Sequence, residues 1–147
     1  RAPCSLSSSV PTAEAAYRFT DGRAVFASGS PFGPVTVRGK TFAPAQGNNV
    51  YIFPGVGLGV MATGARRVTD EMFLAAARTL AAQATREELD RGSIYPALAR
   101  IREVSLEIAV TVADLAYRRD LAAVPRPVDL RQFIESVMYD PVYPCFI

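Results

Sequence analysis

The spacing of apolar residues along the chain predicts a succession of different elements. Residues 12–19 begin with Thr12 as a cap and continue with strong helix formers, so they predict a short helix. The apolar run 23–27 leads into a loop rich in serine and glycine, which is the pattern of a buried strand. Residues 35–43 alternate apolar and polar side chains, as in a small exposed hairpin. This order of elements is typical of an α/β sheet, in which ligands bind beyond the carboxyl ends of the strands.

Residues 50–65 are almost wholly apolar and predict a buried helix that begins at Asn48 or Asn49. The segment is short for a membrane span, and it contains Pro54 and several glycines. We therefore expect a helix inside the protein rather than one in a bilayer.

Three glycines of this segment, Gly55, Gly57 and Gly59, resemble a dinucleotide-binding fingerprint. The spacing G-x-G-x-G lacks the final glycine of that fingerprint, and the motif lies within an apolar helix rather than between a strand and a helix. Gly55 and Gly59 are one helical turn apart, so we interpret them as positions where another helix approaches closely.

The second half of the chain is predicted to be helical, with helices over 69–84, 85–92, 99–119 and 128–138, followed by an extended tail. Thr69 caps the first of these helices, a capping box starts the second, and Gly92 ends it. The third carries one apolar face, formed by Ile101, Val104, Ile108, Val112 and Leu115.

Charged pairs at the ends of these helices are explained by the helix dipole. The acidic pairs occupy first turns, so we interpret them as structural rather than as metal ligands or acid/base groups: Asp70 with Glu71, and Glu87 with Glu88. The basic pairs follow helix ends and are expected to do nothing further: Arg66 with Arg67, and Arg118 with Arg119.

The amino-acid composition limits which partners, catalytic groups and metal sites the chain can have. The chain has 147 residues, half of them apolar, which is enough for one domain with a substantial core. A net charge of +2 is too small to argue for nucleic acid or an anionic membrane as a partner. The chain contains no histidine, which excludes histidine metal ligands, general bases and Ser-His-Asp triads. Cys4 and Cys145 lie at opposite ends and form no zinc or redox motif.

Two loops are candidate ligand sites. Ser28, Gly29 and Ser30 follow the predicted strand and offer hydroxyls and free amides, although a simple turn explains them equally well. Asn48 and Asn49 stand at the start of a very apolar helix, where neutral donors beside free helix N–H groups suit a carboxylate or a hydroxy acid. Asparagine is also an ordinary helix cap, so the structural alternative remains open for this pair.

At these residues the sequence resembles the C-terminal part of a malic enzyme. The resemblance covers nearly the whole chain from residue 12 to 143, and its most specific motifs are FASGSPF and QGNN followed by YIFPG. The matching segments are 12–32, 45–83 and 94–117. The tail ESVMYDPVYP, residues 135–144, is most similar to plant-type NADP-dependent members.

The resemblance implies the fold. It predicts an α/β, helix-rich C-terminal portion of a Rossmann-like NAD(P)-binding domain, with a short buried strand, a small hairpin and C-terminal helices. Residues 1–11 would form an irregular arm, and 12–147 would be the domain portion. Because the chain begins with Arg1, we expect a processed protein or a piece of a longer one.

The resemblance also implies the chemistry. Malic enzymes convert L-malate to pyruvate and CO₂, with reduction of NADP or NAD and with Mg²⁺ or Mn²⁺. It assigns substrate and cofactor contacts to Asn48 and Asn49, and it makes Ser28, Gly29 and Ser30 a cofactor-proximal loop. The family's metal ligands and acid/base residues lie upstream of this segment, so none is assigned here. A homo-oligomer, either dimer or tetramer, is implied by family analogy. The expected location is the cytoplasm or the plastid, and this segment does not distinguish them because any targeting peptide would lie upstream.

One departure from the family pattern limits these expectations. The family has a second malate-binding asparagine before the helix at Thr12, whereas this chain has no asparagine before Asn48. The segment therefore lacks one substrate contact. Because it also has a single lysine, no nucleotide-binding glycine loop and no metal cluster, we expect the 147 residues to be catalytically silent on their own. The alternative is a truncated interaction module that docks on intact enzyme subunits.

Overall fold

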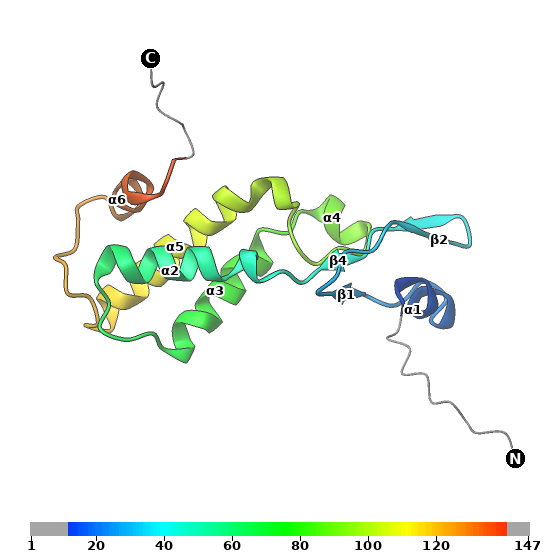
Figure 1. Cartoon of the computed structure of the whole chain (residues 1–147), viewed down its shortest axis with the longest axis horizontal. Coiled ribbons are helices and arrows are strands. Elements are labelled where there is room, and N and C mark those ends of the chain that lie inside the picture. The colour runs from blue at the N-terminus through cyan, green and yellow to red at the C-terminus, as the bar shows by residue number, and fades with distance from the viewer. Residues whose placement is uncertain (1–11, 141–147) are drawn as a thin grey trace, which may run out of the picture. The chain divides into compact units, whose positions relative to one another are not determined.

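The computed structural model describes residues 12–140, and these form two compact units (Figure 1). The first unit comprises the described residues up to Gly47 together with Arg86–Ile94. The second comprises Asn48–Thr85 and the described residues from Tyr95 onward. Helices predominate and the strands are few and short, so the predicted helix-rich α/β class is confirmed.

The first unit begins with helix α1 (Ala13–Phe19), as the sequence predicts. The Thr12 hydroxyl accepts a hydrogen bond from the Ala15 amide at 3.2 Å, which satisfies one of the free donors of the first turn. The helix ends before Asp21 and Gly22, which both have positive φ. A side chain at Gly22 would meet the Phe42 ring at 2.7 Å, so this turn requires glycine.

Four short strands form two pairs in this unit. Strand β1 (Ala27–Ser28) pairs in parallel with β4 (Ala45–Gln46), with Ala27 opposite Ala45. Strands β2 (Val35–Val37) and β3 (Lys40–Phe42) form the predicted hairpin. Arg38 and Gly39 form its turn, with φ values of 51° and 78°. Positive φ at both positions is what a two-residue hairpin loop prefers, because it matches the twist of the strands.

The prediction of a buried strand over 23–27 is wrong in extent and in burial. The strand is only β1, and Val25 is 63% exposed. An apolar run becomes a buried strand only when neighbours cover both of its edges and faces. Among the described residues β1 pairs with β4 alone, so most of the run stays outside the ladder.

The core of the first unit is small and aromatic. Tyr17 and Phe42 stack with ring centroids 4.6 Å apart, and Ala13 completes the buried cluster. Helix α4 (Arg86–Asp90) adds a later stretch of chain, and the Ala43 amide donates to the Arg91 carbonyl at 3.1 Å. The predicted end of this short helix is confirmed, because Gly92 adopts a φ of 81° there.

Over its described residues, the second unit contains helices and 3₁₀ turns but no strand. Its elements in chain order are the 3₁₀ turn η1 (Asn49–Tyr51), α2 (Phe53–Thr63), α3 (Asp70–Ala82), the 3₁₀ turn η2 (Leu98–Arg100), α5 (Ile101–Arg118) and α6 (Leu130–Val137). Thr69 caps α3 and Asp129 caps α6 through their side-chain oxygens. Helix α5 is central, with α2, α3 and α6 packed against it.

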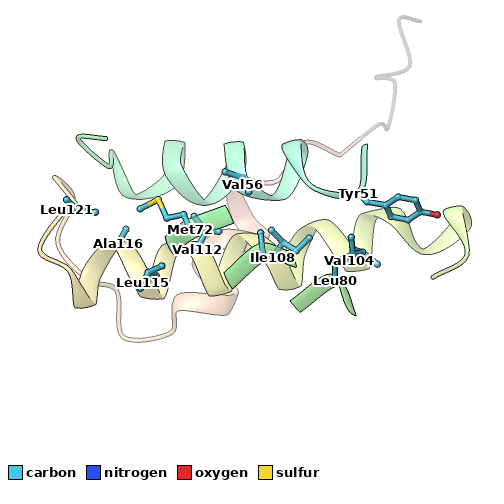
Figure 2. Packing of buried hydrophobic residues seen from close by; sticks show 11 residues of the cluster. Tyr51, Val56, Met72, Leu80, Val104, Ile108, Val112, Leu115, Ala116 and Leu121 are labelled. Carbon is cyan, nitrogen blue, oxygen red and sulfur yellow. The ribbon is translucent and has the colours of Figure 1, made fainter. Parts of the chain in front are cut away.

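The predicted apolar face of α5 forms the core of this unit. Val104, Ile108, Val112 and Leu115 are all buried, together with Met72 and Leu80 of α3 and Val56 of α2 (Figure 2). A second cluster lies on another face of α5, where Ile134 of α6 meets Leu106, Ala109 and Ala113. The long helix is therefore covered on more than one side, as its high content of apolar residues requires.

The glycines of α2 permit the close contact with α5 that the sequence predicts. A side chain at Gly55 would lie 2.7 Å from Cβ of Ile108 and 2.9 Å from the Ser105 carbonyl oxygen. At Gly59 it would lie 2.7 Å from the Ala109 carbonyl oxygen. Gly57 faces away and has nothing within 4 Å. Two of the three glycines are therefore used for helix packing.

Helix α2 differs from its prediction in two respects. Its α-helical part begins at Phe53 rather than at Asn48 or Asn49, because the chain first forms η1 and Pro54 then occupies the first turn, where no N–H is needed. The helix is also not fully buried, since Phe53 is 57% exposed and Met61 is 80% exposed. Among the described residues, no helix has both the length and the apolar character needed to cross a bilayer.

The prediction that Arg118 and Arg119 only complement the dipole of α5 is wrong, because both make ion pairs. The Nε and Nη2 of Arg119 contact the two carboxylate oxygens of Glu71 at 2.8 and 2.5 Å. Arg118 binds Asp114, four residues earlier, at 2.8 Å. The pair therefore does more than complement the helix dipole, because Arg119 ties the end of α5 to the first turn of α3.

Candidate functional site

The carboxyl ends of β1 and β4 lie at the same edge of their parallel pair. The Gly47 amide donates to the Ser28 carbonyl at 2.8 Å, and the Gln46 side-chain amide donates to the Gly29 carbonyl at 3.1 Å. Such an edge is where ligands bind in open α/β sheets. Gln46 was not predicted as a site residue, and only the strand pairing reveals its contact with the serine-rich loop.

The loop of Ser28, Gly29 and Ser30 is held mainly by internal contacts. The Ser28 hydroxyl donates to the Ser30 carbonyl at 2.7 Å, which is a local turn contact. Gly29 and Ser30 are exposed, whereas Ser28 is half-buried. The loop therefore offers the Ser30 hydroxyl and exposed backbone, while the Ser28 hydroxyl proton is already engaged.

Asn48 opens the second unit as the cap of η1. Its side-chain oxygen accepts a hydrogen bond from the Val50 amide at 3.0 Å, and its carbonyl accepts from the Tyr51 amide at 3.1 Å. The side chain is half-buried. The cap leaves the amide NH₂ of Asn48 as a donor, because only its oxygen is engaged.

Asn49 is placed differently from its neighbour. It is exposed, and its side chain makes no hydrogen bond to any other residue of 12–140. Its backbone carbonyl accepts from the Ile52 amide at 3.1 Å. Both the oxygen and the NH₂ of this side chain are therefore available to a ligand, such as a carboxylate or a hydroxyl group.

Tyr51 anchors the turn that presents these two asparagines. Its hydroxyl donates to the Pro96 carbonyl at 2.7 Å in a buried position, and its ring stacks on Tyr95 with centroids 5.2 Å apart. Figure 2 shows the Tyr51 side chain at one end of the core cluster. No local sequence pattern predicts this role, because the anchor joins residues that are distant along the chain.

An apolar groove lies along the exposed side of α2. It has a volume of about 530 Å³, and its lining includes Val50, Phe53, Leu58 and Met61, with Tyr139 beyond the end of α6. The Arg102 side chain donates to the Tyr139 carbonyl at 2.7 Å and closes one side. The groove offers van der Waals contact and few polar groups, so it is suited to apolar surfaces rather than to a charged substrate.

The ionisable groups with shifted pKa values belong to neither candidate loop. Burial raises the pKa of Tyr17, whose hydroxyl has no hydrogen-bond partner among the described residues. Hydrogen bonds from arginines lower the pKa of two carboxyls, from Arg119 to Glu71 and from Arg100 to Glu103. Within residues 12–140, no three metal-ligating side chains come together as a cation would require.

Some predicted features fall outside the described residues. This group includes the predicted irregular arm over 1–11 with Cys4, the segment 3–9 in which the resemblance places the second asparagine of the family, and Cys145 in the predicted tail. Among the predicted site residues, Ser28, Gly29 and Ser30 belong to the first unit, and Asn48 and Asn49 belong to the second.

Comparison with known proteins adds a family match. Residues 3–117 match the family model described as "Malic enzyme, NAD binding domain". The NADP-dependent malic enzyme of Vitis vinifera is 56% identical over 133 residues, which cover 90% of this chain and 22% of the relative.

Two further relatives give a similar picture. The chloroplastic NADP-dependent malic enzyme of Oryza sativa subsp. japonica is 56% identical over 133 residues, covering 90% of this chain and 21% of the relative. The mitochondrial NADP-dependent malic enzyme of Homo sapiens is 51% identical over 137 residues, covering 92% and 23%. The chain therefore spans less than a quarter of the length of the curated relatives that it matches.

Proposed function

Because the chain belongs to the malic enzyme NAD-binding domain family, we propose that it is the C-terminal part of the NAD(P)-binding domain of a malic enzyme. The parent enzyme would oxidise L-malate and decarboxylate the product to pyruvate and CO₂. The observation that carries this proposal is the family match over residues 3–117, supported by more than 50% identity over nine-tenths of the chain.

NADP is the proposed hydride acceptor, because the relatives from Vitis vinifera, Oryza sativa and Homo sapiens are all named NADP-dependent. Gly55 and Gly59 are occupied by packing against α5, so the G-x-G-x-G stretch cannot cradle a pyrophosphate. We propose that the phosphate-binding loop belongs to another part of the parent enzyme.

The divalent metal of the reaction is likewise assigned to residues outside 12–140. The described residues place no suitable group of carboxylates together, so no metal-dependent step is assigned to this chain. Mg²⁺ or Mn²⁺ would polarise the substrate oxygens in the parent enzyme.

Asn48 and Asn49 are the proposed substrate and cofactor contacts. Both lie on one anchored turn, and their amide NH₂ groups are free donors for a carboxylate or a ribose hydroxyl. The loop of Ser28, Gly29 and Ser30 is proposed as cofactor-proximal, because it lies at the carboxyl edge of a parallel strand pair. No general acid or base is assigned within this segment.

The 147 residues are proposed to be catalytically silent when separated from the rest of the enzyme. The test is an assay of the purified chain with L-malate, NADP and Mn²⁺, with an intact NADP-dependent malic enzyme as the positive control. We expect no NADPH formation above the rate without protein. Malate-dependent NADPH formation by the chain alone would contradict the proposed silence.

The mass of the native polypeptide tests the assignment to a parent enzyme. The chain covers 22% of the Vitis vinifera relative, so a parent of that kind is more than four times as long. Intact-mass spectrometry or an immunoblot from the source should detect a subunit of that size. A native product near 15.8 kDa would instead identify the chain as a truncated protein.

A second candidate function is an interaction module that docks on intact malic enzyme subunits. The apolar groove along α2, with Phe53 and Met61 exposed, favours it because solvent-exposed apolar grooves often mark protein interfaces. The chain would then co-purify with intact subunits as a stable 15.8 kDa species. Recovery of the chain only as an aggregate would argue against this function.

Assembly and location follow from the same family argument. We propose a homo-oligomeric parent, either dimer or tetramer, located in the cytoplasm or the plastid. The relative from Oryza sativa is named chloroplastic, which agrees with the plastid, whereas the human relative is named mitochondrial. L-malate and pyruvate are the proposed small-molecule partners.

A further inference from the structure

A polar pocket between α3 and the end of α5 is distinct from both candidate loops. It has a volume of about 410 Å³, which lies within the ordinary range for small-molecule sites. Three arginines and one glutamate line it, with three apolar residues beneath them: Arg78, Arg118, Arg119 and Glu71, and Leu74, Ala75 and Leu115. The charges of the lining sum to +2, so the pocket favours an anion.

Helix α3 contributes one face to this pocket. Glu71, Ala75 and Arg78 are spaced by four and three residues, which places them one above another on the helix surface. Arg78 makes no ion pair or hydrogen bond with the side chains of residues 12–140. Its guanidinium is therefore an uncompensated positive charge beside an apolar floor.

Helix α5 contributes the other two cations. Arg119 donates hydrogen bonds from Nε and Nη2 to Glu71, which leaves the hydrogens of Nη1 for another acceptor. Arg118 binds Oδ2 of Asp114 through its Nε, and Arg126 takes Oδ1 of the same carboxylate. One carboxylate is thus shared by two guanidinium groups, so Arg118 is only partly neutralised.

The dipole of α5 does not cancel the net positive charge of the pocket. The carboxyl end of α5 carries about half a negative charge, which opposes an anion nearby. Three guanidinium groups against one carboxylate exceed that charge several-fold. Arginine forks also match the oxygens of a phosphate group in pairs, whereas an aliphatic ammonium offers only a point charge.

We propose that this pocket binds a phosphate group, as inorganic phosphate or as the phosphomonoester of a small molecule. The phosphate oxygens accept hydrogen bonds from Arg78, Arg118 and Arg119. The body of a phosphomonoester lies against Leu74 and Ala75. The site does not depend on the proposed enzymatic function, because neither asparagine of the η1 turn takes part.

Binding to the purified 147-residue chain tests the proposal. Isothermal titration with inorganic phosphate and with phenyl phosphate is carried out at constant ionic strength in a chloride buffer. We expect saturable binding with one site per chain. Tighter binding of phenyl phosphate would assign the site to a phosphomonoester, and equal affinities would assign it to free phosphate. Absence of saturable binding of both probes would overturn the proposal.

Matched charge variants distinguish phosphate binding in this pocket from a general effect of surface charge. Arg78→Gln should weaken binding at least tenfold, whereas Arg86→Gln, which removes an exposed arginine of α4 paired with Asp90, should leave it unchanged. Glu71→Gln should tighten binding several-fold by releasing Arg119, and Glu87→Gln, on α4, should not. Circular dichroism confirms that each variant is folded. Equal losses in Arg78→Gln and Arg86→Gln would overturn the proposal.

Discussion

Asn48 and Asn49 are adjacent residues with different structural roles. The Asn48 oxygen caps the η1 turn, so this residue contributes to the local fold whether or not a ligand is bound. The Asn49 side chain is exposed and has no partner among the described residues. The sequence alone could not separate their roles, because either asparagine is a plausible cap.

The difference predicts distinct outcomes when each asparagine is replaced in the intact parent enzyme. Either variant should lose one neutral hydrogen bond to malate or to the cofactor. The loss should raise the activation free energy derived from kcat/KM by about 0.5–1.5 kcal/mol, and by more if a buried partner is left unpaired. Asn48→Ala should also lower the free energy of unfolding by about 1 kcal/mol through loss of the cap, whereas Asn49→Ala should not. Steady-state kinetics and urea unfolding measure the two effects. Unchanged kinetics in both variants would remove this turn from the site.

Gly55 and Gly57 offer a matched test of the packing between α2 and α5. An alanine methyl at Gly55 would meet Ile108 at 2.7 Å, so Gly55→Ala should destabilise the chain by about 1–3 kcal/mol. The same change at Gly57 meets nothing within 4 Å and should stabilise the helix by up to about 1 kcal/mol. Urea unfolding of the two variants measures both signs. A stabilising Gly55→Ala would show that the helices are farther apart than described.

At the scale of the element, local signals determined most of the successful predictions. Thr12 and Thr69 cap their helices as expected, and Arg38–Gly39 turns the hairpin, because each signal acts through neighbouring residues. Burial depends instead on distant parts of the chain. Val25 was therefore wrongly placed inside a strand, and the exposed side of α2 was wrongly predicted to be buried.

The residues of the candidate site also differ in whether local sequence signals identify them. The two asparagines and the serine-rich loop could be named from the sequence, because turn and cap residues are recognisable there. Tyr51 could not, since its partner is the Pro96 carbonyl. Arg78 and Arg119 come from different helices, and no spacing within the sequence shows that they line one pocket.

The contact between α3 and α5 predicts a dependence of stability on pH. The Arg119 hydrogen bond lowers the pKa of Glu71, so the ionised carboxylate is favoured in the folded state. Its contribution is fully present above the ordinary glutamate pKa and is lost as the pH falls through the lower, folded-state pKa. The effect should be small, because both side chains are about half exposed.

Urea unfolding at pH 7 and pH 3 measures this contribution. The difference in unfolding free energy between the unmodified chain and Glu71→Gln should be largest at pH 7 and should shrink at pH 3. Arg119→Gln provides the matched control and should show the same trend, because it removes the other half of the pair. A difference that grows on acidification would contradict the assignment.

At the scale of the whole molecule, the apolar surface along α2 predicts self-association of the isolated chain. Phe53 and Met61 are exposed beside the groove, and such surfaces promote aggregation when they are left uncovered. The double variant Phe53→Ser with Met61→Gln should raise the concentration at which the chain stays monomeric. Phe19→Ser is the control, because Phe19 is 92% exposed but lies on α1 and outside the groove.

Light scattering against concentration provides the measurement. We expect the double variant to shift the onset of association to higher concentration, and the control to shift it less. An equal shift for both would attribute the association to exposed aromatic residues in general rather than to the groove.

The two compact units are interleaved along the chain, and this has a consequence for their biosynthesis. The Ala43 amide donates to the Arg91 carbonyl within the first unit, yet all of α2 and α3 is translated between these two residues. Helix α3 in turn packs on α5, which follows Gly92. On the ribosome, neither unit can therefore finish while the nascent chain is short. The first unit can close once Ile94 has left the exit tunnel, whereas the second must wait until α5 has left it.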